Sequence, residues 1–136
     1  MSDYPTTGAT GGVRALLRLE GLMLFTAALL IYAHSGASWR LFFALILVPD
    51  LTFIAFIFGP RIGAIAYNAM HSTAGPIALA LASPLLPESA TPLVAIALIW
   101  FAHIGFDRAL GYGLKYATGF SDTHLGAMGK SRKQFA

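Results

Sequence analysis

The chain has 136 residues, of which 57% are hydrophobic and only 11% are charged, and its mean hydropathy is +0.69. A soluble domain has about 25% charged residues, so this composition predicts a membrane protein. The net charge of +3 comes from scattered Lys and Arg, which argues against nucleic-acid binding, and the lack of Cys excludes a disulfide framework and thiolate chemistry.

Residues 1–12 are rich in Gly and Thr, and we expect a flexible segment there. Four apolar segments follow, and each is close to the roughly 20 residues that cross a bilayer. They are Val13–Tyr32, Trp39–Phe58, Ile62–Leu86 and Pro92–Tyr116. Gly75-Pro76 predicts a kink or a short break in the third segment, just beyond His71. The pattern predicts an all-α, four-helix transmembrane bundle over residues 13–116, followed by a tail over residues 117–136.

The basic residues predict the orientation of this bundle. With four spans, both termini lie on one side of the membrane, and the loops on the opposite side hold only Arg40. The positive-inside rule therefore places both termini in the cytoplasm, in a multi-pass protein of the cell inner membrane. The final Lys130–Lys133 run is typical of a segment attracted to anionic lipid, so we expect membrane lipid as a partner.

Ionisable residues inside the predicted spans are the candidate functional residues. His103 and Asp107 lie four residues apart, on one face of the fourth helix. At a rise of about 1.5 Å per residue, Asp50, His71 and Asp107 each lie roughly 14 Å from the cytoplasmic ends of their helices, and His103 lies about 6 Å deeper. Acids and imidazoles from three helices are therefore expected at one level. Such groups are costly in hydrocarbon unless they are paired, bound to a metal or facing water.

Imidazole and carboxylate at one depth suit a divalent ion such as Zn, Mn or Fe. We therefore interpret four residues as candidate metal ligands: Asp50, His71, His103 and Asp107. In the corresponding mechanism a metal-bound water is the nucleophile. Glu20 is the candidate general base, and Arg108 is the candidate clamp for a phosphate or an oxyanion.

Structural roles explain the same residues in another way. Asp107 can pair with Arg108 or with an Arg of another span, and His103 can donate to a backbone carbonyl. Tyr67, Asn68 and His71 can hydrogen-bond between helices, and proton, ion or pigment binding are further alternatives. The segment with Asp122 and His124 either folds over the mouth of the bundle or, as we expect, forms a solvated tail.

Several stretches together resemble a family of small bacterial integral membrane proteins of unknown function. They are RLEGL (Arg18–Leu22), VPDLT (Val48–Thr52), GPRIGAIAYNAMH (Gly59–His71) and the segment His103–Gly126 with HIGFDRALGYGLKY and DTHLG. The resemblance covers nearly the whole chain and implies four transmembrane helices, without an activity.

Three shorter pieces resemble the inner-membrane, metal-dependent hydrolase-like family with SOS-regulated members. Pro49-Asp50 is similar to its PDxD element, His71-Ser72 to its His-rich element, and His103-x-x-x-Asp107 to its SHxxxDxxTxxG element. Thr52 stands in place of the second Asp, and Tyr67 lies near the place of a missing His. The resemblance implies the same four residues as metal ligands.

The sequence thus predicts a metal-binding membrane protein that hydrolyses a lipid or another amphipathic substrate. One alternative is a non-catalytic accessory subunit of a larger membrane complex, whose polar cluster serves helix association. Another is a small-solute or proton carrier, for which a chain this short would need to form a homo-oligomer.

Overall fold

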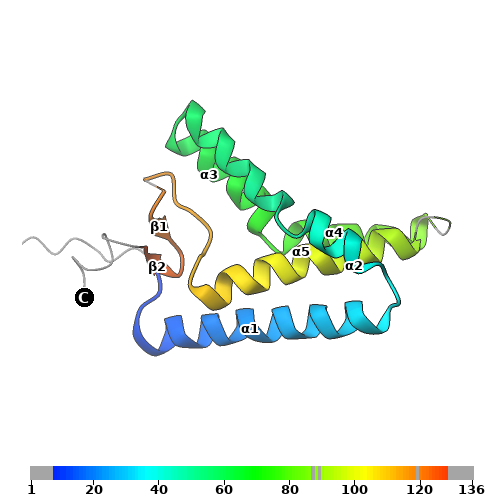
Figure 1. The fold of residues 1–136 in the computed structure, drawn as a ribbon. Helices are drawn as coiled ribbons and strands as arrows, with labels where there is room; N and C mark the ends of the chain where they lie inside the picture. The colour runs from blue at the N-terminus through cyan, green and yellow to red at the C-terminus, as the bar shows by residue number, and fades with distance from the viewer. Residues whose placement is uncertain (1–7, 87, 89, 119, 129–136) are drawn as a thin grey trace, which may run out of the picture.

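The structure, a computed structural model, describes residues 8–86, 88, 90–118 and 120–128 (Figure 1). This part of the chain is mostly helical, as the sequence predicted. Its elements are α1 (Gly11–His34), α2 (Trp39–Leu45), the 3-10 helix η1 (Val48–Phe58), α3 (Pro60–His71), α4 (Ala74–Ala82), the 3-10 helix η2 (Ser83–Leu85), α5 (Ala90–Leu110), and the antiparallel strands β1 (Asp122–Thr123) and β2 (Gly126–Ala127).

Helix α5 is the centre of the arrangement, and α1 packs along it in the antiparallel direction (Figure 1). Glycines permit this close approach. A Cβ atom on Gly105 would lie 2.5 Å from the backbone N of Phe25, and one on Gly21 would lie 2.5 Å from Cβ of Arg108. Small residues of this kind are common where helices pack in membranes. The opposite side of α5 carries α2 and α4, so α5 is enclosed on two sides (Figure 1).

The hydrophobic core lies where α1, α2 and α5 meet. Its buried members are Ala28, Tyr32, Phe42, Ala95, Leu98, Ile99 and Ala102. The ring of Tyr32 packs edge-on against Phe42 at 5.2 Å, and its hydroxyl donates to the backbone carbonyl of Ser38 at 2.6 Å. The hydroxyl of this buried ring therefore has a partner, as buried polar groups require.

The second predicted span is not a single α-helix. Residues Trp39–Leu45 form α2, and Val48–Phe58 form a 3-10 helix of 11 residues. Pro49, in the first turn of η1, lacks the N–H that would continue the α-helical bonding of α2. A 3-10 run of this length is unusual, and such runs mark strained or functional segments.

The third predicted span is divided where the sequence indicated a break. Helix α3 ends at His71, Ser72 has an extended backbone with ψ of 146°, and α4 begins at Ala74. The indole N–H of Trp100 on α5 donates to the carbonyl of Met70 at 2.6 Å. That bond satisfies a carbonyl in the last turn of α3, one of the groups that a helix end leaves without an intrahelical partner.

Helix α5 ends at Leu110, six residues before the predicted end at Tyr116. Gly111 has φ of +92°, its N–H donates to the backbone carbonyl of Arg108 at 3.0 Å, and the N–H of Tyr112 donates to the backbone carbonyl of Asp107 at 2.8 Å. This is the Schellman arrangement, in which a glycine in the left-handed region ends a helix. Gly111 therefore turns the chain away about one turn after Asp107.

Three helical stretches are long and apolar enough to cross a membrane: Gly11–His34, Trp39–Phe58 and Thr91–Leu110. Large apolar side chains stay exposed along them, Leu30, Phe43 and Ile57 among others, as expected of surfaces that face lipid. The apolar helical stretch Ala74–Leu85 is shorter, so the count of four spans and the cytoplasmic side of the termini stay predictions.

The two ends of the described chain meet beside the start of α1, where the N–H of Ala9 donates to the carbonyl of His124 at 2.7 Å (Figure 1). Residues 1–7 of the segment expected to be flexible, and residues 119 and 129–136 of the expected tail, lie outside the described residues.

Candidate metal centre

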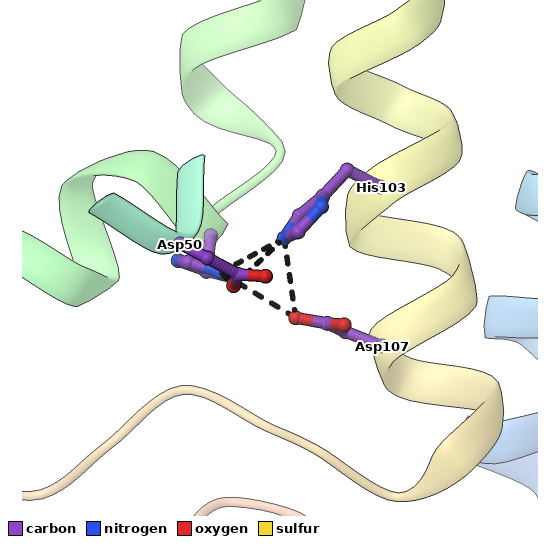
Figure 2. A group of neighbouring side chains, drawn as sticks. Asp50, His103 and Asp107 are labelled. Atoms are coloured by element: carbon purple, nitrogen blue, oxygen red, sulfur yellow. Dashed lines mark hydrogen bonds and ion pairs between the residues drawn. The ribbon is translucent and has the colours of Figure 1, made fainter. Parts of the chain in front are cut away.

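Two of the four candidate ligands lie on α5. His103 and Asp107 lie one turn apart and point to the same side of the helix, as their spacing predicted (Figure 2). Nε2 of His103 lies 3.4 Å from Oδ2 of Asp107. The pair lies in the last two turns of α5, just before Gly111 ends the helix.

His71 reaches the same place from the last residue of α3. Its ring stacks on that of Tyr67, one turn earlier, with centroids 3.7 Å apart and planes inclined by 8°. This stacking and the break at Ser72 fix the direction in which the imidazole points. Nε2 of His71 lies 3.1 Å from Nε2 of His103.

Asp50 comes from the first turn of η1. Its side chain points toward His103 and Asp107 (Figure 2). Oδ1 of Asp50 lies 3.3 Å from Nε2 of His71 and 3.3 Å from Nε2 of His103. The structure thus brings together, from three elements, the four residues that the sequence nominated. One ligand atom from each lies within 4.8 Å of the other three.

Both imidazoles are held by backbone carbonyls. Nδ1 of His71 donates to the carbonyl of Tyr67 at 2.9 Å, and Nδ1 of His103 donates to the carbonyl of Ile46 at 2.6 Å. A carbonyl only accepts, so each neutral ring carries its hydrogen on Nδ1 and presents the lone pair of Nε2 to the centre of the cluster. Histidine ligands of metals are fixed in their tautomer in this way.

The separations between ligand atoms fit a four-coordinate ion. With bonds of about 2.0–2.1 Å, tetrahedral ligand atoms lie about 3.3–3.4 Å apart. The two carboxylate contacts of His71 measure 3.3 and 3.4 Å, those of His103 measure 3.3 and 3.4 Å, and the two Nε2 atoms lie 3.1 Å apart. Five of the six edges of such a tetrahedron thus have nearly the required length.

Exposure differs between the two kinds of ligand. The side chains of His71 and His103 are each 4% exposed, whereas that of Asp107 is 15% and that of Asp50 is 33% exposed. The carboxylates also line a cavity of about 310 Å³, which continues between η1, α3 and the segment after α5. An ion at the cluster would therefore be reached from the carboxylate side, through this cavity.

The cavity has aromatic walls and one buried amine. The rings of Phe53 and Tyr67 lie 5.3 Å apart and those of Phe53 and Phe120 lie 5.5 Å apart. Nζ of Lys115 lies 3.6 Å from the centre of the Phe120 ring and donates to the Phe120 carbonyl at 2.7 Å. Burial lowers the pKa of Lys115 to about 8, although Asp107 acts in the opposite direction.

Asn68 fixes the backbone at Lys115. Its amide nitrogen donates to the carbonyl of Lys115, and its amide oxygen accepts the N–H of Lys115, both at 2.7 Å. Asn68 thereby ties the chain after α5 to α3. Sequence reasoning assigned Lys115 no role in a site and offered hydrogen bonding between helices as one role for Asn68, because nothing local shows that the two residues meet.

The segment around His124 is not a solvated tail. Thr123 and Leu125 are fully buried, and Leu125 accepts a hydrogen bond from Nε of Arg14 at 2.5 Å. Strands β1 and β2 lie beside the segment that leads into α1 (Figure 1). The sequence named this folding-back as the alternative. The sequence signal for it was the pair of glycines, Gly119 and Gly126, that flank the segment. In the structure a Cβ on Gly113 would lie 2.6 Å from Nδ1 of His124, so the close approach of the two segments requires a glycine there.

Glu20 and Arg108 lie in another cavity, of about 120 Å³, between α1 and the C-terminal segment. His124 shares its wall. Burial and the charge of Arg108 lower the pKa of His124, and Nδ1 of His124 accepts the N–H of Leu114 at 2.8 Å. Arg108 directly follows Asp107 on α5, but only Asp107 belongs to the wall of the larger cavity.

The comparisons with known proteins identify a family whose function is unknown. No curated protein and no solved structure matches the chain. None of the comparisons supports the resemblance to the SOS-regulated hydrolase-like family. One family model, described as Domain of unknown function (DUF4260), matches residues 14–128. The match covers α5, all of α1 except its first three residues, and all four clustered residues. The protein therefore belongs to the DUF4260 family.

Proposed function

We propose that this protein binds a divalent transition-metal ion, best matched by Zn, through Asp50, His71, His103 and Asp107. The observation that carries the proposal is the pair of Nε2 atoms 3.1 Å apart, whose rings both donate Nδ1–H to backbone carbonyls. Two lone pairs at that distance repel each other unless a cation or a proton lies between them.

The charges support an ion rather than a proton. Asp50 and Asp107 carry two negative charges into a cluster with two nearly buried imidazoles. Two like charges beside nearly buried groups of a membrane protein are unfavourable unless a positive charge pairs with them. A divalent ion neutralises both carboxylates and accepts one lone pair from each of the four ligand atoms, two Nε2 atoms and two carboxylate oxygens. One shared proton neutralises only one of the two charges.

Metal analysis tests this proposal directly. We expect about one equivalent of Zn per chain in protein that is purified in detergent and dialysed against a Zn-containing buffer. Inductively coupled plasma mass spectrometry measures the metal content. His103→Ala and Asp107→Asn should each lower the affinity for Zn by about 10-fold to 100-fold or more. Loss of a group that only supports a metal ligand already has an effect of that size. His34→Ala is the matched control, because His34 is exposed and its Nδ1 hydrogen-bonds to the carbonyl of Leu30 in its own helix. A folded wild type that takes up no metal would refute the proposal.

A hydrolytic role is the second candidate, and the adjoining cavity favours it. The four protein ligands fill a tetrahedral site, so a water would have to bind as a fifth ligand. A zinc-bound water has a pKa lowered to about 7 and would supply the nucleophile. Asp50 and Asp107 line a cavity of about 310 Å³, so a lipid or another amphipathic substrate would approach from that side. Glu20 and Arg108 lie in the other cavity, so neither has a role in this proposal.

The hydrolytic role predicts metal-dependent turnover. Nitrophenyl esters and nitrophenyl phosphate esters are suitable probes, with Zn-loaded wild type compared with His103→Ala at equal protein concentration. Release of nitrophenolate that needs both the metal and His103 supports hydrolysis. Equal background rates in both proteins would leave a metal-binding protein without this activity.

A further inference from the structure

The cavity beside the metal centre has a composition that restricts what it can hold. Its volume of about 310 Å³ gives room for about ten water-sized groups, which suits a compact ligand and not a whole diacyl lipid. The walls are aromatic at Phe53, Tyr67 and Phe120. A flat apolar group fits such walls, because aromatic rings prefer to stack with an offset or to pack edge to face.

Charge decides which end group the ligand carries. In the metal-loaded protein the carboxylates of Asp50 and Asp107 balance the two charges of the ion. The ammonium of Lys115 then gives the cavity one net positive charge. Lys115 is only 3% exposed. Within the described residues its ammonium donates to the Phe120 carbonyl, and ring faces lie around it, with the Tyr67 centroid at 4.7 Å. A buried cation in this setting favours an anionic partner.

We propose that this cavity binds a small monoanion with a flat apolar body, in the class of an aromatic carboxylate, and that Lys115 selects the anion. The inference rests on the proposed metal function, since without the ion the two carboxylates make the cavity negative and repel such a ligand. Lys115 is a specificity residue here: its charge distinguishes an anion from a neutral molecule of the same shape.

Two fluorinated probes of equal shape test the inference. 4-Fluorobenzoate is an anion and 4-fluorobenzamide is neutral, and their binding to the full-length protein in detergent is followed by fluorine NMR. Empty micelles give the correction for partition into detergent. We expect Zn-loaded wild type to bind the benzoate about tenfold more tightly than the benzamide, since a hydrogen bond to a charged group contributes about 1.5–3 kcal/mol.

Lys115→Met should remove that preference without loss of metal. Arg61→Met is the matched control, because Arg61 is a cation exposed elsewhere, at the start of α3. Retention of the benzoate preference in folded Lys115→Met would overturn the inference. If Lys115→Met does not fold, wild type with and without Zn decides: a benzoate preference that does not depend on Zn overturns the inference equally.

Metal content measured on the same samples separates the two proposals. A protein that binds Zn but does not distinguish the probes refutes the monoanion site and leaves the metal centre standing. A protein that takes up no Zn refutes both. Decanoate, an acyl-chain carboxylate, is the third probe. If decanoate binds more tightly than 4-fluorobenzoate, the ligand is lipid-derived and the inference of a flat, compact ligand is overturned.

Discussion

His71 and His103 face each other through Nε2 atoms 3.1 Å apart, although they lie 32 residues apart in the chain. Each ring is held from behind by a carbonyl, of Tyr67 for His71 and of Ile46 for His103. Two neutral imidazoles so arranged have no hydrogen between them. Their approach is therefore costly by itself, and a bound ion would remove that cost.

Removal of the metal should destabilise the protein. A ligand that binds only the folded state adds about 4 kcal/mol to the free energy of unfolding at a concentration 1,000 times its Kd. We expect a strong chelator to lower the thermal midpoint in detergent and excess Zn to restore it. His71→Ala combined with His103→Ala should abolish the response. An equal response in that double variant would assign the stabilisation to another site.

Replacement of Gly105 by Leu should separate α1 from α5. The added side chain starts at a Cβ position 2.5 Å from the backbone N of Phe25, where no flexible group can move aside. Overpacking of this kind costs about 1–3 kcal/mol, and the thermal midpoint should fall accordingly. Bound Zn should also decrease, because His103 and Asp107 lie on the displaced helix. Gly12→Ala is the control, since a Cβ there meets nothing within 4 Å.

Replacement of Asn68 by Ala should release the chain after α5. The variant loses both 2.7 Å hydrogen bonds to the backbone of Lys115, worth roughly 0.5–1.5 kcal/mol each. Hydrogen exchange followed by mass spectrometry should show faster exchange in peptides around Lys115, with little change in α1. Thr26→Ala removes an exposed side-chain hydrogen bond to the Leu22 carbonyl within α1 and serves as the control. Unchanged exchange around Lys115 would show that another contact holds this segment.

Acidification should destabilise the C-terminal segment through His124. Burial and Arg108 place the folded-state pKa of His124 below its ordinary value of 6.5. In the pH window between the folded pKa and 6.5, the unfolded chain binds a proton that the folded chain does not. The contribution to stability is therefore complete above 6.5 and is lost as the pH falls through the folded pKa.

The variant His124→Asn isolates this effect, because Asn keeps an acceptor for the N–H of Leu114 and does not titrate. Chemical denaturation of metal-free wild type and variant at a series of pH values measures the difference. We expect the advantage of the wild type to decrease toward acid pH. A difference that is constant with pH would exclude His124 as the titrating group.

Local sequence signals located some of the breaks but not the character of each helix. Gly75-Pro76 indicated the break after His71, and α3 ends there. Gly111 carried the signal for the end of α5, although hydropathy alone extended that helix to Tyr116. The 3-10 helix η1 was not predicted, because α and 3-10 helices have the same apolar composition and differ only in hydrogen bonding.

The sequence by itself determined that the protein is helical and apolar enough for a membrane, and that Asp50, His71, His103 and Asp107 are ionisable residues within its apolar segments. Hydropathy and helical rise suffice for that, since both are properties of single segments. Only the tertiary structure decided that Nε2 of both rings faces the carboxylates, that Asn68 holds Lys115, and that Glu20 and Arg108 lie in another cavity. Those facts depend on how helices rotate and where the chain turns back, and packing between distant segments sets both.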